Sequence, residues 1–103
     1  MRKANVFVHG VPAGIMTEIE NNRQYEFKYM SGYIGESVSL TMPVRSEPYY
    51  FDRFPPFFEG LLPEGLLLEG LLRALKIDGK DYFSQLMAVG KDMVGAVTVE
   101  PVK

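Results

Sequence analysis

The 103-residue sequence contains no cysteine, no tryptophan and a single histidine, His9. Without cysteine the chain can form neither a disulfide nor a thiolate metal site, and one histidine cannot make a histidine-based metal cluster. No apolar run approaches the ~20 residues of a membrane span, and the polar Asn5 and an early Gly-Val-Pro turn interrupt any signal-peptide core. We therefore expect a cytoplasmic protein that needs no metal or other cofactor and has no membrane contact.

The basic residues are scattered along the chain, and neither sign of charge dominates. The net charge is −2, and the lysine and arginine residues form no patch or stripe of the kind that a nucleic-acid-binding surface shows. We expect no direct contact with nucleic acid. The plentiful aromatic residues, 7 Phe and 6 Tyr, argue against disorder. A chain of this length has room for one modest core, so we expect a single domain over residues 1–103.

No group of side chains makes a recognisable catalytic site. Gly79-Lys80 and Gly90-Lys91 are each followed by Asp rather than Ser or Thr, so neither is a P-loop. The polar residues without another role are spread over loops: Arg45, Glu47, Asp52, Arg53, Lys91 and Asp92. Since no acid–base or nucleophile set emerges, we expect no catalytic residue and no enzyme activity. A stand-alone enzyme with an unrecognised site is the alternative that the sequence supports least.

Alternation of apolar and polar residues predicts strands over residues 3–9, 14–20, 23–30, 37–42 and 93–99. The clearest alternation is in 23–30, where one face carries Tyr25, Phe27 and Tyr29. In 37–42 the residues expected to point inward are Val38, Leu40 and Met42. Residues 44–56 contain three prolines and are expected to form an irregular loop that packs down on the domain.

Two helices complete the expected fold. The first begins near Pro63, whose fixed backbone angle suits the first helical position. The second covers roughly 80–89, with Asp78 or Asp81 as its N-terminal cap and Gly90 at its C-terminal cap. The predicted fold class is α+β, a small antiparallel meander or sheet of about five strands with two helices packed on one face.

The first helix carries more leucine than one buried face requires. We assign Leu71, Leu72 and Leu75 to the core, because apolar stripes on helices usually face it. Leu66, Leu67 and Leu68 have two open interpretations. They are buried in the domain's own core, or they form an apolar wedge for a partner.

Two segments with a fixed separation resemble the N-terminal subdomain of HipA-like serine/threonine kinases, the toxins of bacterial toxin–antitoxin modules. The first is FFEGLLPEG, whose motif residues are Phe57, Phe58, Leu61, Leu62, Pro63 and Gly65. The second is DYFSQLMAVGKDMVGAVTVEP, whose motif residues are Gly90, Asp92, Gly95, Ala96 and Pro101. The resemblance covers nearly the whole chain and implies the fold of that subdomain.

The resemblance implies the subdomain without the enzyme, because a kinase needs a phosphate-binding lysine, metal-binding Asp and Asn residues and a catalytic Asp that are missing here. The chain is similar to the small HipS proteins of split HipBST modules. In that family the short protein is an antitoxin that binds the kinase toxin, HipT, and a separate HipB-like protein binds operator DNA. The implied partner is therefore a HipA-like or HipT kinase, within a larger complex that includes a HipB-like protein.

The expected kinase interface is the turn before the first helix together with its first residues: Leu62, Pro63, Glu64, Gly65, Leu66 and Leu67. These would project towards the active-site cleft of the kinase and obstruct it. A second possibility is a non-inhibitory subunit that completes a HipA-like fold and supports the stability or activity of the kinase. Both need the same interface, so the sequence leaves the sign of the effect open.

Overall fold

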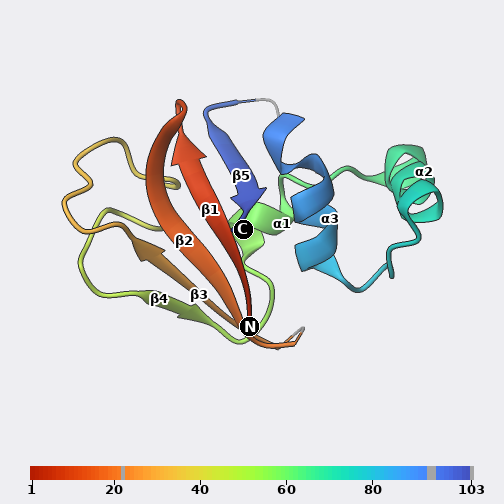
Figure 1. Ribbon diagram of the computed structural model, residues 1–103, viewed down its shortest axis with the longest axis horizontal. Helices are drawn as coiled ribbons and strands as arrows, with labels where there is room; N and C mark the ends of the chain where they lie inside the picture. Colours follow the sequence, from red (N-terminus) through yellow and green to blue (C-terminus); the bar gives the residue numbers. More distant parts are fainter. Residues whose placement is uncertain (22, 93–94, 103) are drawn as a thin grey trace.

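The computed structural model describes residues 1–21, 23–92 and 95–102. Its centre is a five-stranded antiparallel sheet with strand order β4-β3-β2-β1-β5 (Figure 1). The strands are β1 (Arg2–Val8), β2 (Val11–Glu20), β3 (Gln24–Tyr29), β4 (Tyr49–Phe51) and β5 (Val97–Pro101). The helices are α1 (Pro56–Glu59), α2 (Gly65–Leu75) and α3 (Tyr82–Val89), and a 3₁₀ turn, Gly90–Asp92, follows α3. The predicted α+β class is confirmed.

One face of the sheet carries the core. The alternation that the sequence predicts in the first and third strands is confirmed, since Ala4, Val6 and Val8 are buried from β1 and Tyr25, Phe27 and Tyr29 from β3. Against this face pack Phe58 of α1 and two residues of α3, Phe83 and Leu86. Phe27 and Phe58 meet with ring centroids 6.1 Å apart. The helical cover of the sheet therefore comes from α1 and α3.

The prediction of a strand over residues 37–42 is wrong. This segment holds only an isolated bridge between Ser39 and Met42, and Leu40, expected to point inward, is fully exposed. Val38 and Met42 are buried as expected. Their backbone is fixed by the hydroxyl of Tyr29, which accepts from Val38 N at 2.9 Å and donates to Met42 O. Hydrogen bonds to the Tyr29 hydroxyl thus take the place of the backbone hydrogen bonds that a neighbouring strand would make.

The sheet still has five strands, because part of the predicted irregular loop forms a strand in place of residues 37–42. Tyr49–Phe51 forms β4, which pairs with β3 in the register Tyr25↔Phe51 and Phe27↔Tyr49. Phe54 and Pro55 then turn inward and are buried, so the expectation that the loop packs down is confirmed. Three residues on an edge are too few for alternation to identify a strand.

The second predicted helix is confirmed as α3. Asp81 is its N-terminal cap, and its carboxylate accepts a hydrogen bond from Ser84 N at 3.2 Å. Gly90 is the C-terminal cap residue, as predicted, and its φ of −58° is right-handed. The predicted last strand begins later, at Val97, and its residues 93–94 lie outside the described part of the chain.

The expectation that both predicted helices pack on one sheet face is wrong for α2. In Figure 1 α2 stands at one end of the molecule, with α3 between it and the sheet. No residue of α2 is buried. Over residues 1–21, 23–92 and 95–102 no helix combines the length and apolar character required to cross a membrane.

Candidate functional site

The α2 helix and the turn before it form an arm, which we define as residues 61–76. Pro63 lies before the helix rather than at its first turn, and Glu64 is the N-terminal cap residue, with an extended backbone. Gly65 follows with φ +61°, a left-handed conformation that glycine adopts readily and that turns the chain sharply into the helix. The helix ends at Leu75, and its C-terminal cap residue, Lys76, is also left-handed with φ 55°. Sharp turns at both ends make α2 a separate element.

The leucines of α2 are exposed to solvent. Six of its eleven residues are leucine, yet Leu66 is 85% exposed, Leu67 76% and Leu75 53%. Leu71 and Leu72 are half-buried. The assignment of Leu71, Leu72 and Leu75 to the core is therefore wrong, because α3 and α1 already cover the sheet and leave no space there for a third helix.

The leucines lie on more than one side of the helix. Leu68, Leu71, Leu72 and Leu75 follow the i, i+3, i+4, i+7 spacing of one stripe. Leu67 lies at the margin of this stripe, whereas Leu66 is close to the side that carries Arg73. Single exposed apolar residues are ordinary on protein surfaces, whereas several on one short helix make that helix a candidate interaction surface.

The predicted interface residues are consecutive in the arm, but they differ in exposure. Leu62 belongs to the protein's own core at 9% exposure, and its N–H donates to Glu59 O at 3.1 Å. Pro63 is half-buried, whereas Glu64 and Gly65 are exposed together with Leu66 and Leu67. Leu62 thus anchors the arm, and the surface available to a partner begins after it.

The other motif residues mostly support the fold. Phe58 is fully buried, and Phe57 packs edge-on against it with ring centroids 5.2 Å apart. Gly90 is buried against β5, and Gly95 has φ +113°. The half-buried members are Leu61 and Ala96, and the exposed ones are Asp92 and Pro101. Ala96 O accepts a hydrogen bond from His9 N at 2.8 Å.

A polar cluster that the sequence did not reveal joins the sheet to the start of α3. Arg2 makes a two-point contact with Glu18, with Nε–Oε1 at 2.6 Å and Nη2–Oε2 at 2.8 Å. The same guanidinium reaches Asp81 Oδ1 at 2.9 Å and Ser84 Oγ at 2.8 Å. Tyr25 donates its hydroxyl to Glu18 Oε2 at 3.3 Å. The only available signal was strand register, which places Arg2 and Tyr25 on either side of Glu18.

The cluster shifts the pKa values of three of its members. Hydrogen bonding to Glu18 raises the pKa of Arg2 above its ordinary value, against the opposing effect of burial. Burial and the nearby charge of Glu18 raise the pKa of Tyr25 to about 12. Burial alone would raise the pKa of Asp81, but hydrogen bonds from Arg2 and Ser84 outweigh it and hold the pKa below 3.8. These shifts accompany an ion-pair network that fixes structure.

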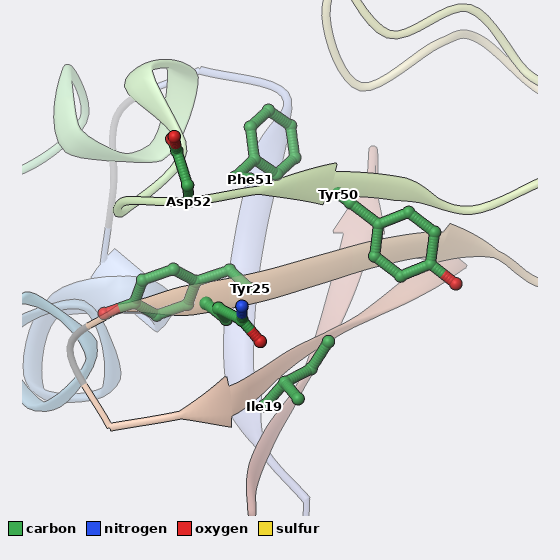
Figure 2. A pocket seen from close by; sticks show the side chains of 6 residues that line it. Ile19, Tyr25, Tyr50, Phe51 and Asp52 are labelled. Atoms are coloured by element: carbon green, nitrogen blue, oxygen red, sulfur yellow. The ribbon is translucent and has the colours of Figure 1, made fainter.

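A shallow depression of about 660 Å³ lies at the edge of the sheet and is shown in Figure 2. Its lining includes Ile19, Tyr25, Tyr50 and Asp52. Figure 2 shows the hydroxyl groups of the two tyrosines pointing away from each other. Asp52 contributes one carboxylate to the lining, and a single carboxylate does not make an acid–base pair. Within the described residues no group of three or more His, Cys, Asp or Glu side chains could hold a metal ion. The arm is therefore the better candidate site.

Fold and surface together define a small α+β domain whose distinctive feature is an exposed leucine-rich arm. The family model described as "HipA N-terminal domain" matches residues 4–100. The chain belongs to the HipA N-terminal domain family. A solved structure titled "N-terminal domain of HipA toxin" is similar over the whole of this chain and 94% of its own, with 31% identity and a TM-score of 0.78.

Relatives of two lengths are similar to the chain. An uncharacterised protein of Haemophilus influenzae is 33% identical over 103 residues, which are 100% of this chain and 95% of that protein. "Putative kinase Y4dM" and "Putative kinase Y4mE" of Sinorhizobium fredii are 32% and 29% identical over 94% and 98% of this chain. The chain spans only 26% and 25% of these two proteins.

Proposed function

We propose that this domain is a cytoplasmic, non-enzymatic antitoxin that binds a HipA-like serine/threonine kinase toxin and neutralises it. The observation that carries the proposal is the arm, in which Leu66 and Leu67 are largely exposed at the start of a helix that the domain's own core does not use. Family membership supplies the class of partner, since the domain also occurs in kinase-named relatives.

The proposed contact is an apolar wedge made by residues 63–67. Gly65 turns the chain so that Leu66 and Leu67 lead the helix, and Leu62 holds the base of the turn in the core. Burying one such side chain contributes roughly 1.5–3 kcal/mol. Two of them would contribute about 3–6 kcal/mol to docking in the cleft between kinase lobes, where the wedge would obstruct ATP or substrate, and the rest of the domain surface that meets the kinase would supply the remainder.

The surface charge supports a complex in which a third protein, and not this domain, binds DNA. The net charge is −2 and the basic residues are scattered, so this chain is unsuited to binding DNA phosphates. A HipB-like protein in the same complex would contact the operator, while this domain contacts the kinase.

The test is a growth assay with the kinase, combined with a pull-down. Co-expression of the kinase and the wild-type domain should restore growth, and the two proteins should co-purify. Leu66→Asp with Leu67→Asp should abolish both effects while the domain stays folded, because burying an unpaired carboxylate at the interface carries a large desolvation cost.

The matched control is Ile34→Asp with Leu40→Asp. These two apolar side chains are 97% and 100% exposed and lie outside the arm, so the control removes at least as much exposed apolar surface elsewhere and should still restore growth. Full neutralisation by the Leu66/Leu67 variant, or equal loss in both variants, would contradict the wedge.

A second candidate role is that of a structural or activating subunit. Its support is that the same domain makes up about a quarter of the kinase-named relatives, in which it is part of the kinase chain. For this role, co-expression would increase toxicity or the yield of folded kinase instead of relieving growth arrest, with co-purification unchanged.

A further inference from the structure

The side chain of Gln85 is a buried amide that is only half satisfied. Gln85 lies on α3 between the core residues Phe83 and Leu86 and is 1% exposed. Its Nε2 donates to two backbone carbonyls, Asp78 O at 3.3 Å and Gly79 O at 3.1 Å. Its Oε1 is buried and has no hydrogen-bond partner among the residues that the structure describes.

Such an amide is costly for the fold. Removing an amide from water is unfavourable unless both of its polar atoms are paired, and an apolar residue of the same size would suit a position beside Phe83 and Leu86. Asp78 and Gly79 are exposed, so water could satisfy their carbonyl groups in the absence of Gln85. The effect of the amide is therefore to fix the place of the segment that it contacts.

That segment is the connector between α2 and α3, residues 76–81. Asp78 organises it locally, because its carboxylate accepts from Lys80 N at 2.8 Å and its carbonyl accepts from Asp81 N at 3.0 Å. Asp81, at the end of the connector, is tied to the sheet by Arg2. The connector is thus held by a buried side chain on one side and an ion pair on the other, while α2 itself buries no residue.

We propose that Gln85 is a positioning residue that fixes the orientation of the arm by holding the carbonyl groups of Asp78 and Gly79. The kinase-binding role of the arm rests on the proposed function above. Without the two hydrogen bonds the connector samples several conformations, and only a fraction of molecules present α2 correctly. The apparent affinity for a partner falls in proportion to that fraction.

The orientation of the arm can be measured in the free protein, because the chain has no cysteine of its own. Spin labels on Lys3→Cys in β1 and Ala74→Cys in α2 occupy two exposed sites on the sheet and the arm. Pulsed electron paramagnetic resonance then gives the distribution of distances between them. We expect one narrow distribution for the otherwise wild-type protein and a broad one for Gln85→Met.

Two further measurements separate positioning from a general loss of structure. The urea midpoint of Gln85→Met should be unchanged or higher, since the variant removes a half-satisfied buried amide. Its affinity for the kinase should fall about tenfold if the competent fraction falls to a tenth. The control Leu86→Met changes the neighbouring core residue with little change in volume, and it should keep the narrow distribution and the affinity.

The outcomes distinguish this inference from the proposed function. A narrow distance distribution in Gln85→Met would overturn the positioning role whatever the kinase does. A broad distribution together with no kinase binding by the wild-type protein would support positioning and contradict the proposed function. If both Gln85→Met and Gln85→Leu fail to fold, the amide serves the fold itself and the inference is overturned.

Discussion

Replacing Gly90 with alanine should destabilise the domain for a reason unrelated to backbone flexibility. Its φ of −58° suits any residue. The obstacle is β5, because an alanine Cβ would lie 2.2 Å from Val99 O and 3.0 Å from both the carbonyl carbon and the Cβ of Val99. Val99 is paired with Val6 in the sheet, so its backbone cannot move away without disturbing the ladder. The glycine is needed for the close approach of α3 to the sheet.

The magnitude follows from two opposing effects. Overpacking of a core costs about 1–3 kcal/mol, and the upper end applies here because backbone meets backbone and neither side has a rotamer to change. Alanine also restricts the unfolded chain, which stabilises the folded state by about 0.4–1 kcal/mol. The net loss in the free energy of unfolding should be about 2 kcal/mol. Relief of the clash would shift α3 and loosen Phe83 and Leu86, which pack on the same face.

Urea unfolding followed by circular dichroism measures this change, and Gly70→Ala is the matched control. Gly70 lies within α2, and a Cβ built there meets nothing within 4 Å. This control should gain about 0.5–1 kcal/mol from helix propensity. The steric reasoning is refuted if Gly90→Ala is as stable as the wild type, or if both substitutions change stability in the same direction.

The polar cluster at the start of α3 gives two more predictions. Arg2→Met should lower the free energy of unfolding by about 2–3 kcal/mol, because it removes the two-point contact between Arg2 and the buried Glu18. The control Lys3→Met changes an exposed neighbour and should alter the free energy of unfolding by less than about 0.5 kcal/mol. Equal effects of the two substitutions in urea unfolding would contradict the ion-pair account. Tyr25 should ionise only near pH 12 in an absorbance titration. Because the unfolded chain loses this proton at lower pH, stability should fall as the pH rises from about 10 towards 12, and Tyr25→Phe should remove that part of the fall.

Strands could be predicted from the sequence where apolar and polar residues alternate without interruption and the sheet buries one of its faces. In β3 the residues Tyr25, Phe27 and Tyr29 are all buried, as the pattern indicates. The same pattern failed at Val38 and Met42, which are also buried. There the backbone bonds to the hydroxyl of Tyr29 instead of to another strand. In this segment the alternation identified two of the three side chains expected to be buried, since Leu40 is exposed, and it says nothing about the hydrogen-bond partner of the backbone.

The leucines of the arm could be recognised from the sequence as an apolar stripe on a helix, but they could not be assigned correctly to the core or the surface. Periodicity identified a helix with an apolar stripe, and the surplus at Leu66 and Leu67 indicated a second surface. Whether a stripe is covered depends on how much of the sheet other segments already occupy, and Phe58, Phe83 and Leu86 occupy it here. That competition between distant segments is invisible in a local pattern.

The proposed site is carried by a helix that does not pack on the sheet, so its position depends on contacts at its two ends. A helix excluded from its own core stays at a fixed angle only if its ends are held, and Leu62 holds one end while the connector contacts of Gln85 hold the other. An isolated helix of eleven residues is marginal in water, so these two anchors keep α2 in place in the free domain, and a kinase that buries Leu66 and Leu67 would stabilise the helix further. Binding of the kinase should therefore raise the stability of α2 without changing its orientation.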